Sequence, residues 1–436
     1  MKTKALLIAL AMMAGLNCSM KAQTDDEDEI TVTDNDGNEE VIEFPEAMSY
    51  NLDSLMNLYL SRTYLGDDEC NMTDVNPTFD KEVYIDRLSR IPSVMELSYN
   101  DVVQKFIDRY SGRLRRSISY MLAASNFYMP IFEEALETYG LPLELKYLPV
   151  IESALNPKAV SRVGATGLWQ FMLATGKMYG LQVNSLVDER RDPVKSSYAA
   201  AHFLSDLYKI FGDWNLVIAA YNCGPENINK AIRRSGGERD YWRIYPYLPK
   251  ETRGYVPAFI AANYIMTYYC DHNICPMTSR LPAKTDTVMV NRNIHLQQVA
   301  SVCGIDIEQL RTLNPSYRKD IVPGSSELSC LRLPITEMGK FIDLQDSVYN
   351  YRADLYLNKR TEVSVNDDTP TYQSSKRSSK RSKSSKSRRG SKTVTVRKGM
   401  TLSHIAAQNG TTVKKLQQLN GIKGTNIRAG RKIRVR

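Results

Sequence analysis

Apolar residues recur every three to four positions between about residue 80 and residue 270. The stretches "DVVQKFIDRY", "MPIFEEALETYG", "SSYAAAHFLSDLYKIFG" and "NLVIAAYN" all show this spacing, which is typical of amphipathic helices. Gly140, Gly180 and Gly212 stand where such helices would end. Because strand-like alternation is scarce in this region, the pattern predicts an α-helical domain over residues 80–280.

Two later segments share one pattern when the first is shifted by 106 positions. Matching pairs include Thr287 with Thr393, Leu296 with Leu402, Gly304 with Gly410, and Asn314 with Asn420. Each copy begins with an alternating stretch such as "TVTVR", continues with two helical runs, and ends with a stretch such as "RKIRVR". An ungapped match of this kind indicates a duplicated module. The prediction is a strand–helix–helix–strand unit at residues 285–335 and again at residues 393–436.

The segments outside these domains have compositions that do not build a core. Residues 24–46 contain eleven acidic and no basic side chains, so residues 23–79 are predicted to be an acidic, partly disordered N-terminal segment. Residues 336–392 are predicted to be a linker. Its part "SSKRSSKRSKSSKSRRGSK" (374–392) is typical of a flexible, self-repelling tether. The expected fold class is therefore α+β and multidomain.

The first residues, "MKTKALLIALAMMAGLNCSMKAQ", place two lysines before an apolar run that is too short to span a bilayer comfortably. This arrangement predicts a secretory signal peptide over residues 1–22 and an exported protein. Cys18 raises the alternative of lipid attachment, which would associate the protein with a membrane. The expected location is the periplasm or the periplasmic face of the outer membrane.

The net charge of +8 is unevenly distributed, because residues 369–436 carry nineteen Lys and Arg and no acidic residue. A basic tail can bind nucleic acid. This one lacks interleaved aromatic residues, and an exported protein would meet anionic envelope polymers or lipid headgroups instead. No nucleic-acid partner is expected, and a solvated linker without a fixed partner is the alternative.

Six cysteines remain once the signal peptide is removed, an even number that permits disulfides in an exported chain. The stretch "CDHNIC" could close a small loop through Cys270 and Cys275, or both thiols could stay free. One histidine between two cysteines does not complete the ligand set that zinc requires. We therefore expect no metal and no cofactor.

The stretch "LPVIESALNP" (148–157) puts Glu152 inside an otherwise apolar helical run that ends at Asn156-Pro157. The ordinary explanation is a glutamate on the wet face of an amphipathic helix. A carboxyl group beside apolar walls has another property, because burial disfavours its charged form and lets it keep a proton near neutral pH. Glu152 is therefore a candidate general acid.

Three further segments follow Glu152-Ser153: "GATGLWQFM" (164–172), "AAYNCGPENI" (219–228) and "LPKETRGYVPAFIA" (248–261). In this order, the four segments resemble the motifs of the lytic transglycosylase catalytic domain, in the goose-lysozyme-like superfamily. The resemblance covers about residues 85–270 and is greatest to the membrane-bound murein transglycosylases of type D. The duplicated modules resemble LysM domains. The implied fold is a mainly α-helical, lysozyme-like domain followed by two small LysM-like modules.

The resemblance implies a lyase that cleaves the β-1,4 bond between N-acetylmuramic acid and N-acetylglucosamine in peptidoglycan. Glu152 would protonate the glycosidic oxygen and then take a proton from the muramic C6 hydroxyl, which closes a 1,6-anhydro ring. One carboxylate then suffices. Substrate-binding or positioning roles are implied for Ser153, Gly167, Trp169, Gln170, Tyr221, Asn222 and Tyr255. Trp169 and Tyr221 could also be ordinary core aromatics, and Cys223 could make the site sensitive to thiol reagents.

In the last module the resemblance implies glycan contacts at Gly399, Thr401 and Ile427, although Met400 stands where aspartate is usual. The first module reads "NRNIHL" (291–296) in place of the usual loop, so residues 285–335 are expected to be a degenerate LysM-like module. The expected partner is the glycan strand of peptidoglycan.

Two other functions are compatible with parts of the sequence. A hydrolytic muramidase would use water and a second carboxylate, such as Asp188 or Asp192. Asp192-Pro193 looks like a helix start, where aspartate caps backbone N–H groups, which disfavours this alternative. A non-catalytic peptidoglycan-binding scaffold would not need Glu152 together with the accompanying motifs.

Overall fold

The computed structural model describes residues 29–33, 39–46, 60–64, 75–279, 281–282, 284–358, 393–396, 400–422, 424, 427 and 431–435. The chain divides at residue 374 into two compact units. Within the described residues, no helix combines the length and the apolar character that crossing a bilayer needs. The predicted signal peptide, Cys18 and the tether at residues 374–392 lie outside the described residues.

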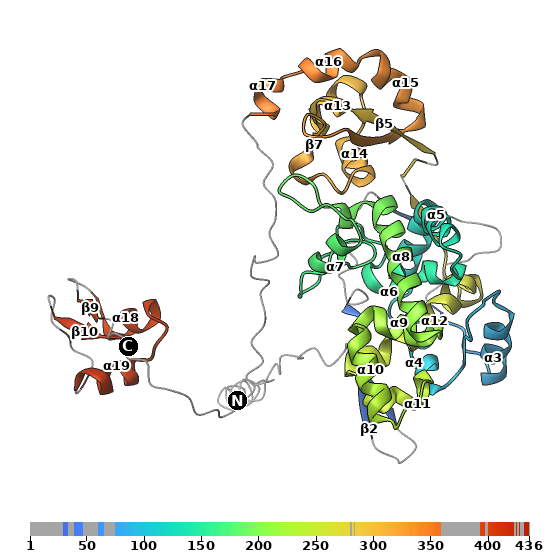
Figure 1. Ribbon diagram of the computed structural model, residues 1–436, viewed down its shortest axis with the longest axis horizontal. Coiled ribbons are helices and arrows are strands. Elements are labelled where there is room, and N and C mark those ends of the chain that lie inside the picture. Colours follow the sequence, from blue (N-terminus) through green and yellow to red (C-terminus); the bar gives the residue numbers. More distant parts are fainter. Residues whose placement is uncertain are drawn as a thin grey trace, which may run out of the picture. The chain divides into compact units, whose positions relative to one another are not determined.

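The helical domain is built around α12 (Lys250–Thr267). From Thr252 to Met266, every side chain of this helix except that of Arg253 is buried, so the helix must form the centre of a domain. It packs against α4 (Asp101–Ser111), α6 (Leu148–Ser153) and α9 (Trp214–Cys223) (Figure 1).

The other helices surround this core, with α8 (Pro193–Phe211) packed against both α9 and α5 (Arg115–Thr138). Asp192 caps α8 by accepting hydrogen bonds from the backbone N–H groups of Val194 and Lys195, as the sequence predicts. The remaining helices are α3 (Lys81–Arg90), α7 (Leu173–Met178), α10 (Pro225–Arg234) and α11 (Tyr241–Ile244). The predicted α-helical domain is confirmed.

An N-terminal hairpin packs onto this core. Strand β1 (Glu29–Thr33) pairs antiparallel with β2 (Glu39–Glu43), so these strands are ordered within the segment that is predicted to be partly disordered. Ile42 is completely buried, and the ring of Phe44 stacks on Phe106 with centroids 5.2 Å apart. A Cβ on Gly254 of α12 would lie 2.5 Å from the carbonyl oxygen of Glu43. The missing side chain therefore lets the hairpin lie directly on the central helix.

A second connection joins the two ends of the helical domain. Strand β3 (Leu60–Tyr64) pairs antiparallel with β4 (Met277–Ser279). Cys275, just before β4, is disulfide-bonded, whereas Cys270 is an exposed thiol. The small loop closed by a Cys270–Cys275 disulfide is therefore not formed.

The first module has the predicted strand–helix–helix–strand order. Strand β5 (Thr285–Val290) pairs antiparallel with β8 (Ser329–Pro334), and α13 (Leu296–Cys303) and α14 (Ile307–Leu313) lie between them in sequence. A second pair, β6 (Asn293–His295) with β7 (Ile321–Pro323), was not predicted.

The predicted end of this module at residue 335 is wrong. Three helices follow, α15 (Ile335–Asp343), α16 (Gln345–Asn350) and α17 (Ala353–Tyr356). Phe341 and Val348 are completely buried in the core of the module. The amide nitrogen of Gln298 on α13 donates hydrogen bonds to the backbone carbonyls of Val348 and Tyr351 at 3.1 and 2.8 Å. These contacts make the helices part of the module rather than a linker.

The last module repeats the same order with β9 (Thr393–Thr395), α18 (Leu402–Gln408), α19 (Val413–Asn420) and β10 (Lys432–Arg434). Asn314 and Asn420, which match in sequence, also match in structure. Each side-chain oxygen accepts a hydrogen bond from the backbone N–H of an arginine in the final strand, Arg332 or Arg434. The offset of 106 positions between matching residues does not hold for the final strands, because the second copy has a shorter connection before β10 than the first copy has before β8.

Candidate active site

A cleft of about 600 Å³ opens in the helical domain where α6, α8, α9 and α12 meet the loop before α7. Its walls include residues from each of the four sequence motifs. The predicted site residues that line it are Glu152, Gln170, Tyr221, Asn222 and Tyr255. The order of the motifs therefore predicted a true convergence in space.

Glu152 lies in the last turn of α6, next to an unusual backbone turn. Ala154 and Leu155 both adopt left-handed conformations, with φ of 50° and 58°. Such angles are uncommon outside glycine and cost free energy, and they cluster at functional sites. The turn ends α6 immediately after Ser153.

The carboxyl group of Glu152 is tuned by its surroundings. The pKa of Glu152 is raised to about 8; desolvation by burial is the largest cause, and the negative charge of Glu251 acts in the same direction. The hydroxyl of Tyr255 donates a hydrogen bond to Oε1 of Glu152, which favours the ionised form and lowers the pKa. The balance leaves Glu152 protonated near neutral pH, while part of its surface stays open to the cleft.

Other cleft residues are held by the protein itself. The hydroxyl of Tyr221 donates a hydrogen bond to the backbone carbonyl of Trp169 at 2.7 Å. The side-chain oxygen of Asn222 accepts one from the hydroxyl of Thr252 at 2.8 Å. Gln170 has a left-handed backbone, with φ of 48°, and its amide donates to the carbonyl of Gly167 at 2.7 Å. These bonds fix the three side chains in the cleft wall.

Two of the predicted site residues, Ser153 and Trp169, lie behind that wall. Ser153 is completely buried, and its hydroxyl lies 2.9 Å from the carbonyl oxygen of Leu168. Trp169 is also completely buried, with its indole N–H donating to Ser197. Of the roles expected for Ser153, burial permits positioning rather than substrate contact, and Trp169 is a core aromatic.

Gly167 packs closely against another backbone segment and does not border an open space. Its φ is +89°, and a Cβ there would lie 1.8 Å from the carbonyl oxygen of Arg190. The glycine therefore lets the loop before α7 press against the segment that precedes α8.

The structure adds acidic cleft residues that the sequence motifs did not identify. Glu251 precedes Tyr255 by one helical turn, so both occupy one face of α12, and this spacing could have indicated it. Glu46, from the N-terminal hairpin segment, accepts a hydrogen bond from the backbone N–H of Arg162 at 3.0 Å. Its position in an acidic, featureless stretch gave no signal. Asp206 of α8 also lines the cleft.

The two carboxylates considered for a hydrolytic mechanism lie elsewhere. Asp192 caps α8, and Asp188 is completely buried among arginines. Neither lines the cleft.

Cys223 does line the cleft, but burial raises the pKa of its thiol to about 11. A protonated thiol is a poor nucleophile, so the expected sensitivity to thiol reagents is weak near neutral pH.

The sites predicted in the last module have mainly structural contacts. The hydroxyl of Thr401 accepts a hydrogen bond from the backbone N–H of His404 and caps α18. Ile427 packs against the core of the module, and Gly399 lies outside the described residues. Among the residues that the structure describes, no cluster of histidine, cysteine and carboxylate side chains is arranged to hold a metal.

Comparison with known families places these domains. Residues 129–244 match the family model "Transglycosylase SLT domain". The chain carries an SLT domain. Residues 284–350 match "Lytic transglycosylase MltD, LysM-like domain", and residues 394–436 match "LysM domain". The SLT match includes every predicted cleft residue except Tyr255, which follows it on α12.

Several characterised proteins are similar to this chain. Membrane-bound lytic murein transglycosylase D of Escherichia coli (strain K12) is 30% identical over 312 residues, which are 71% of this chain and 63% of that protein. Soluble lytic murein transglycosylase of the same strain is 34% identical over 124 residues, 27% of this chain and 19% of that protein. The chain thus spans less than two thirds of the length of these relatives.

A solved structure, the 70 kDa soluble lytic transglycosylase of Escherichia coli, has a TM-score of 0.31 and 25% identity over 38% of this chain and 30% of its own.

Proposed function

We propose that the protein is a lytic transglycosylase that cleaves the β-1,4 bond between N-acetylmuramic acid and N-acetylglucosamine in peptidoglycan, with Glu152 as its only general acid and base. The observation that carries this proposal is the position of Glu152 in an SLT-domain cleft, where it accepts a hydrogen bond from Tyr255 and where burial raises its pKa. The similarity to a murein transglycosylase supports the choice of substrate.

The proposed reaction needs one proton carrier. Glu152 donates its proton to the glycosidic oxygen as the bond from that oxygen to C1 breaks, and the bonding electrons leave with the oxygen. The resulting carboxylate, stabilised by the hydrogen bond from Tyr255, takes the proton of the muramic C6 hydroxyl. The C6 oxygen then bonds to C1 and forms the 1,6-anhydro ring. Glu152 ends protonated, and no water is consumed.

The test is digestion of purified sacculi in heavy-oxygen water, followed by mass spectrometry of the products. We expect unlabelled 1,6-anhydromuropeptides from the native protein. Glu152→Gln should lose about 10²–10⁴-fold in rate, because the amide cannot donate the proton. Glu226→Gln, an exposed change on α10, is the matched control and should be fully active. A folded Glu152→Gln protein with normal turnover would refute the proposal.

A hydrolytic muramidase is the second candidate, because Glu46, Asp206 and Glu251 share the cleft with Glu152. Hydrolysis would give reducing ends that carry the label. A non-catalytic scaffold would bind sacculi and release no product at all.

The LysM domain supports a glycan partner, and we propose the strands of peptidoglycan. The cell envelope is the corresponding location, supported by the predicted signal peptide and by the membrane-bound relative.

A further inference from the structure

The SLT domain and the LysM-like domain are joined by backbone hydrogen bonds. Val187 and Tyr317 form an antiparallel bridge. The N–H of Asp188 donates to the carbonyl of Ser316 at 2.9 Å, and the N–H of Arg318 donates to the carbonyl of Leu186 at 2.6 Å. Backbone pairing of this kind fixes the register between the two domains, so a pocket at their junction has defined walls.

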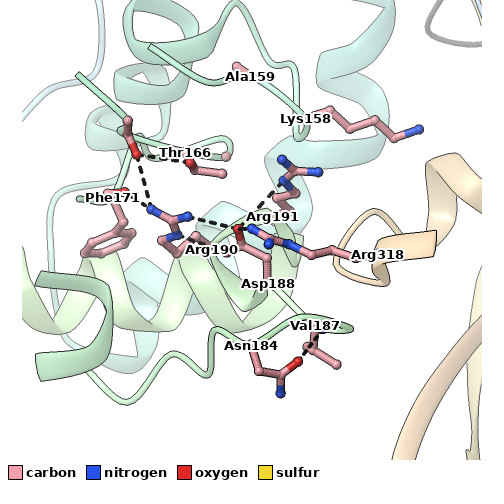
Figure 2. A network of polar contacts seen from close by, with 12 residues as sticks. Lys158, Ala159, Thr166, Phe171, Asn184, Val187, Asp188, Arg190, Arg191 and Arg318 are labelled. Atoms are coloured by element: carbon pink, nitrogen blue, oxygen red, sulfur yellow. Dashed lines mark hydrogen bonds and ion pairs between the residues drawn. The ribbon is translucent and has the colours of Figure 1, made fainter. Parts of the chain in front are cut away.

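Such a pocket, of about 490 Å³, lies at the junction, and half of its lining residues are cations. Lys158 and Arg191 come from the SLT domain, and Arg311, Arg318 and Lys319 come from the LysM-like domain. Figure 2 shows Lys158 and Arg191 on the SLT domain and Arg318 extending from the LysM-like domain toward Asp188. We call this site the junction pocket.

The nearby carboxylates do not balance these charges. Asp188 is completely buried and forms ion pairs with more than one arginine, with oxygen–nitrogen distances of 2.9 Å to Arg190 and 2.8 Å to Arg318. The Nε atom of Arg191 is 4.0 Å from the same oxygen. Although burial opposes the charged form, Arg190 and Arg318 lower the pKa of Asp188, so it is ionised. A single buried charge is thus shared among three guanidinium groups.

The other two carboxylates near the pocket, Asp320 and Glu308, both pair with Arg311. Both oxygens of Asp320 accept hydrogen bonds from Arg311, at 3.1 and 2.6 Å. Lys319 and Asp320 both have left-handed backbones, with φ of 58°, in this rim. Lys319 is exposed there and forms no ion pair with any residue in the described part of the chain.

Two cationic groups inside the pocket carry hydrogen-bond donors that have no acceptor among the described residues. The ammonium of Lys158 forms no hydrogen bond or ion pair with a described residue. Burial lowers its pKa, the charges of Glu308 and Asp320 oppose this shift, and those of Arg311 and Arg191 add to it. The Nε–H of Arg191 is buried without a hydrogen-bond acceptor among the described residues. Desolvated donors without acceptors are costly, and an anion supplies the acceptors that they lack.

We propose that the junction pocket binds an oxyanion of the carboxylate class that the peptides of peptidoglycan carry. The charge of the ligand follows from the pocket alone, and its source rests on the proposed function. Arginine forks and a lysine point charge match carboxylate oxygens well. The pocket also adjoins the cleft wall, because the carbonyl of Ala159, next to Lys158, accepts hydrogen bonds from Gly167 and Gln170.

The test is calorimetric titration of the full-length protein with three probes: the dipeptide Ala-Glu, inorganic phosphate, and Ala-Gln amide, which has no carboxylate. The variant pair Lys158→Gln/Lys319→Gln removes two pocket charges that hold no internal ion pair. The matched control, Lys230→Gln/Arg234→Gln, removes two exposed charges from α10. The basic tail contributes equally in all three proteins.

We expect Ala-Glu to bind the native and control proteins alike and to bind the pocket variant about tenfold more weakly or worse, as loss of charge-assisted bonds predicts. Ala-Gln amide should not bind. Equal affinity of the native protein and the pocket variant for Ala-Glu and for phosphate would overturn the site. Phosphate binding that depends on the pocket, with none for Ala-Glu, would overturn the carboxylate assignment.

Glu152→Gln separates this proposal from the proposed function. That variant should bind Ala-Glu as the native protein does while failing to cleave sacculi. If the native protein does not cleave sacculi but the binding pattern holds, the proposed function fails and the anion site stands.

Discussion

Tyr255 donates a hydrogen bond to Glu152, and Glu251, one turn earlier on the same helix, faces the same carboxyl group with a negative charge. The two residues move the pKa of Glu152 in opposite directions, on top of the larger increase that burial causes. One helix thus carries both the residue that favours ionisation and the residue that opposes it, and each can be changed separately.

Tyr255→Phe should move the alkaline limb of the pH–rate profile to higher pH. The change removes the hydrogen bond that lowers the pKa of Glu152, so the pKa rises above about 8 and the acid stays protonated further into the alkaline range. The measurement is the release of muropeptides from sacculi as kcat/KM against pH. Tyr208→Phe, on the exposed face of α8, is the control and should not move the limb.

Glu251→Gln should move the same limb to lower pH, because it removes the charge that raises the pKa of Glu152. Cleavage should persist below the new midpoint, and the products should still be 1,6-anhydro species. Complete loss of activity at every pH would instead identify Glu251 as a second catalytic carboxylate and favour the hydrolytic alternative.

Glu152→Gln should stabilise the fold increasingly as the pH rises. The pKa of Glu152 is about 8 in the folded protein and close to 4.5 without burial, so the native protein loses this contribution to stability as the pH rises between the two values. The glutamine does not titrate. The difference in melting temperature between variant and native protein should therefore be small near pH 4 and larger near pH 9 in thermal unfolding. A difference in melting temperature that does not change with pH would show that folding does not raise the pKa of the Glu152 carboxyl group.

Gly167→Ala should destabilise the SLT domain more than Gly180→Ala does. Both glycines have similar positive φ, +89° and +84°, so the backbone cost of about 1–2 kcal/mol is common to both changes. Only at Gly167 would the added Cβ meet backbone, the carbonyl oxygen of Arg190, whereas nothing lies within 4 Å at Gly180. Thermal unfolding of the two variants measures the difference, and equal melting temperatures would contradict this account.

Deleting residues 374–436 should weaken binding to sacculi while leaving cleavage of short soluble glycans nearly unchanged. The LysM domain supplies a second contact, which a linker makes intramolecular. Pull-down at high salt separates glycan recognition, which should persist in the full-length protein, from attraction by the basic residues, which salt screens. Equal binding by truncated and full-length proteins at both salt levels would rule out the final domain as the anchor.

The sequence predicted the features that depend on local periodicity and on motif order. Helical spacing located the SLT domain, and the motifs brought Glu152, Tyr221 and Tyr255 to one cleft. Periodicity does not report which side of a wall a motif residue occupies, so the sequence left open whether Ser153 contacts substrate or positions Glu152 and whether Trp169 is a core aromatic; both residues are buried.

Features that depend on tertiary contacts were missed. The left-handed backbone of Ala154 is stable only because the surrounding core holds it, and its own side chain gives no sign of it. From sequence alone, the helices after residue 335 resemble a linker. The structure shows that Phe341 is buried in a core formed mainly by residues that precede it in the chain. Likewise, the sequence did not identify Glu46 as a cleft residue, because it stands in an acidic stretch. Burial of its neighbours Ile42 and Phe44 nevertheless holds that stretch against the domain.

The contact between Ile42 and Gly254 sets an order of events during folding. The hairpin strand is among the first parts of the domain to be synthesised, and α12, which it covers, is among the last. Phe44 can contact Phe106 of α4 early, whereas the contact of Ile42 with Gly254 forms only when nearly the whole domain has been made. Contacts between such distant parts of a chain form slowly. Packing of β2 on α12 therefore joins the beginning of the domain to its end, and this part of the core is complete only after α12 has been made.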